Sequence, residues 1–184
     1  LRSEPGYYYL IVDWIDKDNI LCYKIKGQER KFVAINLDGN EIELNFEISD
    51  EQIVASKDGM IAYTNSANDT VYVSKFENTS TLSTIHKYKL NGTLRVRDGV
   101  NVFSPDNSKL ALVYVPDGNR YEREVKIFDL SNGSTQNVAF PEKKGEIAAI
   151  LEVSWIDNNT LLTVVISGLD ESESFTTWRY SVIG

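Results

Sequence analysis

Short stretches in which apolar and polar residues alternate run along most of the chain, and turn-forming residues separate them. The clearest example is 102–114 followed by 124–138. Alternation at every second residue favours β-strands, because successive side chains of a strand point to opposite faces of a sheet. Pro105-Asp106 supplies one tight turn, and Asn132-Gly133 supplies a hairpin turn. We therefore predict strands joined by tight turns, and no segment predicts a convincing helix.

The arrangement of strand, turn and strand recurs four times along the sequence. An aspartate marks the first turn of each repeat, at Asp16, Asp58, Asp106 and Asp157, with intervals of 42, 48 and 51 residues. Two repeats have similar sequences at this turn, Asp-Trp-Ile-Asp-Lys-Asp-Asn-Ile-Leu at 13–21 and Ser-Trp-Ile-Asp-Asn-Asn-Thr-Leu-Leu at 154–162. Repeats of about 40 to 50 residues with about four short strands each are typical of β-propeller blades.

The predicted fold class is therefore all-β, a β-propeller of about four blades of four-stranded antiparallel sheet. The blades lie at about 7–46, 50–90, 96–140 and 146–183, so one propeller domain or a partial propeller covers 1–184. A β-sandwich built from regular hairpins is the alternative. The equivalent tryptophans Trp14 and Trp155 are predicted to lie in the core between blades.

The third repeat resembles the blade motif of TolB-type propellers, which are also similar to WD-repeat propellers. It reads Phe-Ser-Pro-Asp-Asn-Ser-Lys-Leu-Ala-Leu at 103–112, followed by Ile-Phe-Asp-Leu-Ser-Asn-Gly at 127–133. The resemblance extends over nearly the whole chain and implies the architecture of a blade array. It implies little about function, because this architecture serves many unrelated roles.

Four blades is a small number for propellers of this type. The sequence therefore leaves four possibilities open: part of a longer propeller, an open arc, a small ring, or a ring completed by a second copy. An open arc exposes sheet edges and faces, which favours pairing with another chain. A homodimer formed through open blade edges is accordingly one expected partnership.

Charge and composition exclude several kinds of partner and site. The formal net charge is −8, from 19 basic and 27 acidic residues, and no run of basic residues is longer than Lys143-Lys144. Nucleic acid is therefore not an expected partner. No stretch approaches 18 consecutive apolar residues, so we expect no membrane insertion by this chain. With Cys22 as the one cysteine and His86 as the one histidine, an internal disulfide and a Cys/His zinc site are excluded.

The sequence predicts no catalytic, cofactor-binding or metal-binding residues. Propellers of prolyl-oligopeptidase-type hydrolases resemble this chain, but their catalysis needs a Gly-x-Ser-x-Gly elbow that is absent from it. His86 is predicted to face solvent on an outer strand, and Cys22 to be buried. The repeated aspartates are interpreted as acceptors of backbone hydrogen bonds in turns. The acidic stretch 170–173 is interpreted as a solvated hairpin tip.

Aromatic residues near the predicted blade ends are the remaining candidates for binding. Tyr7, Tyr8 and Tyr9 cannot all face one way in a strand, so at least one of them faces outward. Surface aromatics are frequent anchors for protein and sugar partners. The candidate partner-binding residues are Tyr7, Tyr8, Tyr121 and Trp178.

The function predicted from the sequence is a non-catalytic module for protein–protein interaction, with the partner unknown and no cofactor. Two alternatives stay open, the regulatory propeller portion of a larger prolyl-oligopeptidase-type hydrolase and a carbohydrate-binding propeller. The TolB-type resemblance, the low cysteine content and a start without methionine lead us to expect an extracytoplasmic or cell-surface protein of a bacterium. A cytoplasmic location stays open.

Overall fold

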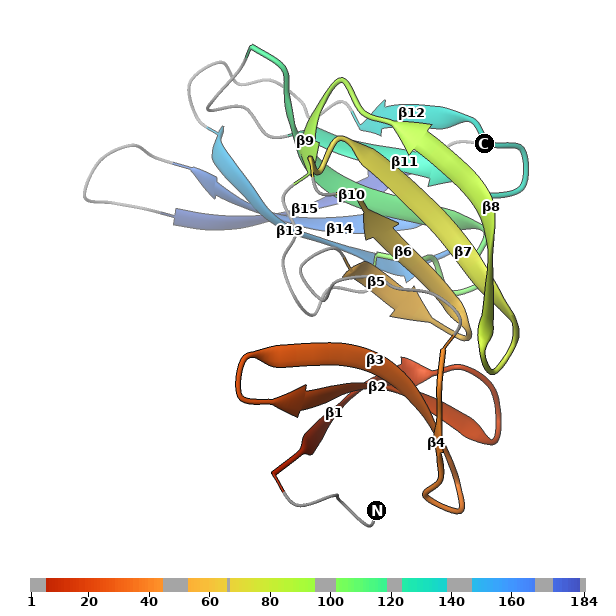
Figure 1. Cartoon of the computed structure of the whole chain (residues 1–184). Helices are drawn as coiled ribbons and strands as arrows, with labels where there is room; N and C mark the ends of the chain where they lie inside the picture. The colour runs from red at the N-terminus through yellow and green to blue at the C-terminus, as the bar shows by residue number, and fades with distance from the viewer. Residues whose placement is uncertain are drawn as a thin grey trace. The chain divides into compact units, whose positions relative to one another are not determined.

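The computed structural model describes residues 6–44, 53–65, 67–94, 102–118, 124–138, 147–167 and 174–182. These residues form strands, bridges and turns but no helix, and the strands make four antiparallel sheets (Figure 1). In each sheet neighbouring strands follow one another along the chain, as in the meander of a propeller blade. The predicted all-β class is confirmed, and the fold is propeller-like. Within the described ranges no helix could cross a membrane.

Sheet one consists of β1 (Tyr8–Trp14), β2 (Asn19–Lys26), β3 (Glu29–Asn36) and β4 (Glu41–Ile42). Sheet two consists of β5 (Ile53–Lys57), β6 (Met60–Thr64), β7 (Thr70–Asn78) and β8 (Thr81–Lys89). Sheet three consists of β9 (Gly92–Leu94), β10 (Lys109–Pro116), β11 (Glu124–Asp129) and β12 (Thr135–Val138). Sheet four consists of β13 (Ile147–Asp157), β14 (Thr160–Ser167) and β15 (Ser174–Ser181).

The chain divides into two compact units, Leu1–Lys89 and Leu90–Gly184, and each unit contains two sheets. The grouping of all four sheets into one propeller domain stays a prediction.

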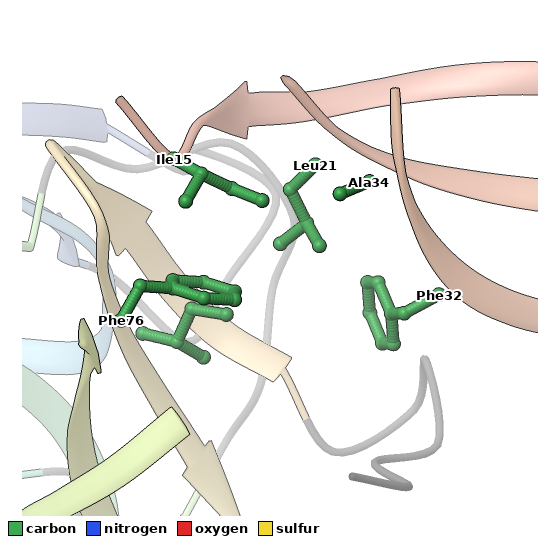
Figure 2. Packing of buried hydrophobic residues seen from close by; sticks show 6 residues of the cluster. Ile15, Leu21, Phe32, Ala34 and Phe76 are labelled. Carbon is green, nitrogen blue, oxygen red and sulfur yellow. The ribbon is translucent and has the colours of Figure 1, made fainter. Parts of the chain in front are cut away.

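The core of the first unit lies between sheets one and two. Alternation along β2 and β3 puts Leu21, Phe32 and Ala34 on one face of sheet one, which we call the Leu21 face. With Ile15 they form a buried cluster that includes Ile61 and Phe76 of sheet two. Figure 2 shows Phe76 approaching the side chains that sheet one contributes. Each large apolar side chain buried there contributes roughly 1.5–3 kcal/mol to stability.

A glycine at the β5–β6 hairpin allows the two sheets to approach at this joint. Lys57 pairs with Met60, and the two residues between them have positive φ, 49° at Asp58 and 76° at Gly59. The Gly59 N–H donates to the carbonyl oxygen of Trp14 at 3.2 Å. A Cβ on Gly59 would lie 2.5 Å from the carbonyl oxygen of Ile15. Only glycine fits this backbone-to-backbone contact.

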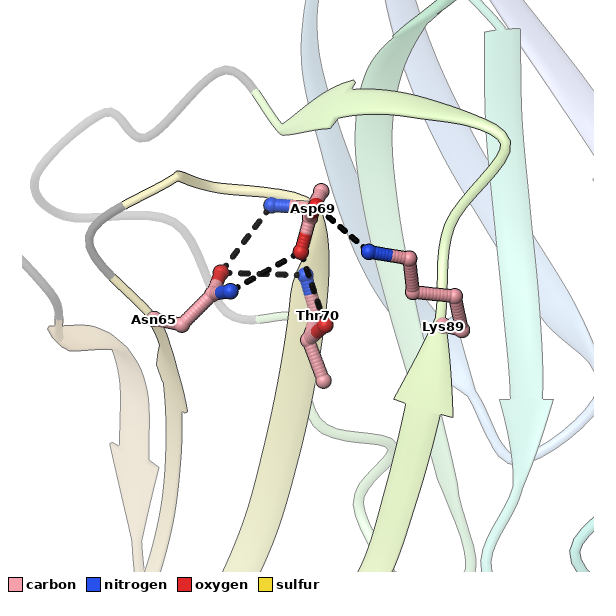
Figure 3. Close-up of polar contacts among 4 residues, drawn as sticks. All are labelled: Asn65, Asp69, Thr70 and Lys89. Carbon is pink, nitrogen blue, oxygen red and sulfur yellow. Dashed lines mark hydrogen bonds and ion pairs between the residues drawn. The ribbon is translucent and has the colours of Figure 1, made fainter.

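The β6–β7 loop of sheet two is held by a network of polar contacts (Figure 3). The Asn65 side chain accepts hydrogen bonds from the backbone N–H of Asp69 at 3.1 Å and of Thr70 at 3.2 Å, and donates to the Asp69 carboxylate at 2.9 Å. Lys89, at the end of β8, pairs with the same carboxylate. The hydrogen bond from Lys89, followed by those from Thr70 and Asn65, lowers the pKa of Asp69 to about 2. The loop thereby ties the start of β7 to the end of β8.

In the second unit, sheets three and four are joined by polar side chains. The Trp155 indole Nε1–H donates to the carbonyl oxygen of Val102 at 2.9 Å, and this bond is buried. Asn158 accepts two hydrogen bonds from the 105–109 turn region, one from the Asp106 backbone N–H and one from Lys109 Nζ, both at 3.1 Å. The turns of neighbouring repeats therefore contact each other directly.

Candidate functional site

Sheet one has a second face that is only partly covered, and a β-bulge determines which residues lie on it. Ile20, Cys22 and Lys24 alternate along β2 on this side, which we call the Cys22 face. In β1, Ile11 pairs with Cys22 and Trp14 pairs with Ile20, with a register shift between Ile11 and Asp13. Residues three apart point to opposite faces in a regular strand. The bulge therefore brings Ile11 and Trp14 to the same face.

The centre of the Cys22 face is buried, while its β1 side is exposed. Cys22, Val33 and Ile35 are 1%, 1% and 3% exposed, and Tyr9 and Ile20 pack against them. Ile11 is 67% exposed and Trp14 is 47% exposed. Burial raises the pKa of the Cys22 thiol, which favours the unreactive protonated form. The predicted burial of Cys22 is confirmed.

Lysines and tyrosines cluster at one end of the Cys22 face. The side chain of Lys24 is buried, and its Nζ donates to Glu41 Oε2 at 2.7 Å. The same oxygen accepts a hydrogen bond from the Tyr9 hydroxyl at 3.1 Å. The Tyr7 ring lies under two cations, with Lys24 Nζ 4.5 Å and Lys26 Nζ 4.7 Å from its centroid. Residues from β1, β2 and β4, with Tyr7 just before β1, thus form one connected cluster.

This cluster has a positive balance of charge. Lys31 Nζ lies 4.0 Å from Glu41 Oε1, so Glu41 is the carboxylate shared by Lys24 and Lys31. Burial favours a higher pKa for Glu41, but the hydrogen bonds from Lys24 and Tyr9 outweigh it, and the pKa is lowered. Lys24 and Lys31 therefore share one ionised carboxylate, while Lys26 lies over the Tyr7 ring. The sequence did not reveal this, because Lys24 and Lys26 alternate with apolar residues and the tyrosines come from another segment.

The turn aspartates belong to the architecture of the repeats. Asp16, Asp106 and Asp157 each accept a hydrogen bond from the backbone N–H two residues further on, at 2.8, 3.0 and 2.8 Å. Burial works against the ionised form of Asp106, but bonds from two serines lower its pKa to about 2. Asp58 differs, because it is the first of the two positive-φ residues of a two-residue hairpin. Among the described residues, no group of three His, Cys, Asp or Glu could hold a metal ion.

The four residues predicted to bind a partner have different positions. Tyr8 is 54% exposed in β1, and Tyr7 is half-buried in the lysine cluster beside the Cys22 face. Tyr121 lies outside the described residues, as does the side chain of Trp178, whose backbone belongs to β15. Their role in binding stays a prediction. Sequence reasoning missed Ile11 and Trp14, whose exposure depends on the bulge and on neighbouring sheets.

Two predictions of burial need correction. Trp155 is 8% exposed, as expected for a residue between blades, but Trp14 is 47% exposed. The difference is local: the Trp155 indole donates to the carbonyl oxygen of Val102 and is buried there, whereas the described residues show no equivalent bond for the Trp14 indole. His86 was predicted to face solvent, but it is half-buried and stacks on Tyr88 with ring centroids 5.5 Å apart.

No family model matches this chain, and no curated protein matches it significantly. Among solved structures, it is similar to the uncharacterised protein lmo1340 of Listeria monocytogenes, with a TM-score of 0.47, 16% identity, and coverage of 98% of this chain and 56% of that one. It is also similar to the N-terminal domain of Nup159, and to a chain in an S. cerevisiae assembly of Dbp5 with Nup159 and Gle1. In both cases the TM-score is 0.41 and the identity 11%, with coverage of 98% of this chain and 52% of the other. The chain thus spans about half the length of these structures, and the likenesses carry no argument about function.

Proposed function

We propose that this chain is a non-catalytic, propeller-like module that binds a protein partner through the Cys22 face of sheet one. The exposure of Ile11 and Trp14, at 67% and 47%, is the observation that carries the proposal. Both are large apolar side chains brought to one sheet face by a bulge, beside the buried Cys22 cluster. Adjoining exposed apolar residues that continue a buried core are typical of surfaces that another protein covers.

The chemistry of the face indicates what kind of partner surface would fit. Tryptophan and tyrosine are frequent anchors of protein interfaces, because they bury a large area and retain a polar group for hydrogen bonding. The indole of Trp14 offers such a donor, and the exposed Lys26 and Lys31 favour carboxylates on the partner. The partner surface is therefore apolar at its centre and acidic at one side.

We further propose that the module is of the TolB type and works outside the cytoplasm in a bacterium. The motif at 103–112 and 127–133 and the single cysteine support this assignment. Fractionation of producing cells tests the location, since an extracytoplasmic protein would be degraded by protease added to intact spheroplasts. Resistance to the protease until the cells are lysed would contradict the proposed location.

Site-directed photo-cross-linking in producing cells tests the binding surface. The cross-linker p-benzoylphenylalanine replaces Trp14 in one variant and Ile85, which is 45% exposed on β8, in a matched control. We expect a covalent protein adduct from position 14 and none from position 85. The absence of any adduct from position 14, or equal adducts from both positions, would contradict the proposed binding surface.

A further inference from the structure

The second unit contains a small pocket beside the β11–β12 hairpin, with a volume of about 190 Å³. Val182, just after β15, lines it from the side of sheet four. Sheet three and its hairpin line the rest, with Lys109, Ile127, Asp129, Asn132, Ser134 and Gln136. Because all these residues belong to the described part of one compact unit, the pocket is a feature of that unit by itself.

The pairing of strands in sheet three brings the lining side chains together. Lys109 of β10 is paired with Asp129 of β11, and Ile127 of β11 is paired with Gln136 of β12. Paired residues share a face of a sheet, and so do residues two apart in one strand. These four side chains therefore lie on one face of sheet three. Lys109 Nζ donates to the carbonyl oxygen of Asn158 at 3.1 Å, so this face is turned toward sheet four.

The pocket combines a buried apolar part with several polar groups. Ile127 and Val182 supply the apolar part and are 3% and 6% exposed. Lys109 can only donate hydrogen bonds, and the Asp129 carboxylate can only accept them. Groups that both donate and accept come from the side chains of Asn132, Ser134 and Gln136.

The two charges of the pocket balance each other. Hydrogen bonds from the hydroxyl and the backbone N–H of Ser131 lower the pKa of Asp129, so its carboxylate is ionised at neutral pH. Lys109 places a positive charge on the neighbouring strand. A ligand with a net charge of either sign would therefore meet one like charge in the pocket, and a neutral ligand would meet no such repulsion.

We infer that this pocket binds one neutral hexose ring. Each sugar hydroxyl both donates and accepts hydrogen bonds, which matches the mixture of groups in the lining. The C–H groups of a sugar ring can pack against Ile127 and Val182. A volume of 190 Å³ is below the roughly 300 Å³ at which pockets for drug-sized ligands begin, so one ring is the size that fits. A hydroxyl also costs less to remove from water than an ammonium or a carboxylate, which favours a sugar over an amino acid.

The sugar site goes beyond the proposed protein-binding function and is independent of it. The pocket belongs to sheets three and four, whereas the Cys22 face belongs to sheet one. The photo-cross-linking result at position 14 therefore decides nothing about the pocket, and the sugar experiment decides nothing about the Cys22 face.

Amide NMR of the isotopically labelled chain tests the inference with D-glucose, D-galactose, D-mannose and N-acetyl-D-glucosamine. A ligand with so few atoms is expected to have a Kd in the millimolar range, so each sugar is added up to about 50 mM. We expect at least one sugar to shift the amide resonances of Ile127 and Gln136 along a saturable curve. Glycine and inorganic phosphate at the same concentration should leave these resonances in place.

Two variants and a matched control assign the binding to the pocket. Ser134→Leu puts an apolar side chain into the pocket and should weaken sugar binding about tenfold or more. Thr135→Leu is the control, because Thr135 is exposed on the same strand but pairs with Phe128 on the opposite face, and it should keep the wild-type Kd. Asp129→Asn keeps an oxygen that can accept the Ser131 N–H but removes the charge, and should weaken binding about threefold or more.

The amide spectrum of each variant shows whether it is folded, and Asp129→Asn decides the assignment if Ser134→Leu does not fold. The inference is overturned if none of the four sugars gives a saturable shift, or if the shifts lie outside the pocket. Unchanged affinity in the folded pocket variants, or equal losses in Ser134→Leu and Thr135→Leu, overturns it as well. A larger response to glycine or phosphate than to every sugar would show that the pocket recognises charge, and the hexose assignment would then be wrong.

Discussion

The joint between sheets one and two and the joint between sheets three and four connect neighbouring repeats through different groups. In the first unit the contact runs through backbone, with Gly59 against the carbonyl groups of Trp14 and Ile15 and a buried apolar cluster beside it. In the second unit it includes the indole of Trp155 and the amide of Asn158. One repeated architecture therefore does not fix which atoms connect the repeats. The loss of stability caused by a substitution at the joint should differ between the two units.

The largest expected effect is at the backbone joint of the first unit. Gly59→Ala would place a methyl group 2.5 Å from a carbonyl oxygen and strain a backbone with φ of 76°, and we expect a loss of about 3 kcal/mol. Gly27→Ala is the matched control, since Gly27 also has positive φ, at 60°, but no atom lies within 4 Å of its added Cβ. The control should lose about 1 kcal/mol, from backbone strain alone. Urea unfolding measures both values, and equal losses would show that the contact with Ile15 is not tight.

A smaller effect is expected at the side-chain joint of the second unit. Trp155→Phe keeps an aromatic ring but removes the indole donor to the Val102 carbonyl, and it should destabilise the protein by about 1–2 kcal/mol. The Val102 carbonyl still accepts the backbone N–H of Ala111 at 2.8 Å, which limits the loss. Trp14→Phe, at the equivalent exposed position, should change stability by less than about 0.5 kcal/mol. Urea unfolding measures the loss of stability in each of the two variants. A larger loss from Trp14→Phe than from Trp155→Phe would reverse the comparison.

The smallest effect concerns the pH dependence of the β6–β7 loop in the first unit. The pKa of Asp69 is about 2 in the folded protein, against about 3.9 for an unfolded aspartate. Because the folded pKa is lower, the stabilisation is present above pH about 4 and is lost as the pH falls toward about 2. Asp69→Asn should reduce the steepness of this loss in thermal unfolding followed between these pH values. The control Asp38→Asn, in the exposed β3–β4 turn, should keep the wild-type slope, and an unchanged slope for Asp69→Asn would contradict the assignment.

Much of the fold could be predicted from the sequence because its signals are local. Alternation at every second residue and turn pairs such as Asn132-Gly133 predict strands and hairpins within about ten residues of chain. The turn role of Asp16, Asp106 and Asp157 followed from the same reasoning, and their hydrogen bonds confirm it.

The candidate site depends on contacts that these local patterns do not contain. Trp14 and Trp155 stand in nearly identical sequences, but Trp155 is 8% exposed with its indole bonded to the Val102 carbonyl, whereas Trp14 is 47% exposed. The bulge in β1 reverses the alternation between Ile11 and Trp14 without a glycine or proline to signal it. The lysine cluster forms across three strands and the residue before β1. Its residues are therefore not contiguous in the sequence, and no run of basic residues predicts it.

The burial of Cys22 makes the protein suited to labelling at a single introduced cysteine. Cys22 is the one cysteine in the sequence, it is 1% exposed, and burial raises its thiol pKa. A maleimide reagent, which reacts with accessible thiolates, should therefore leave the wild type unlabelled. A cysteine introduced at an exposed position such as Lys17 would then carry a spin label or fluorophore at one defined place, with Cys22 left in its native core.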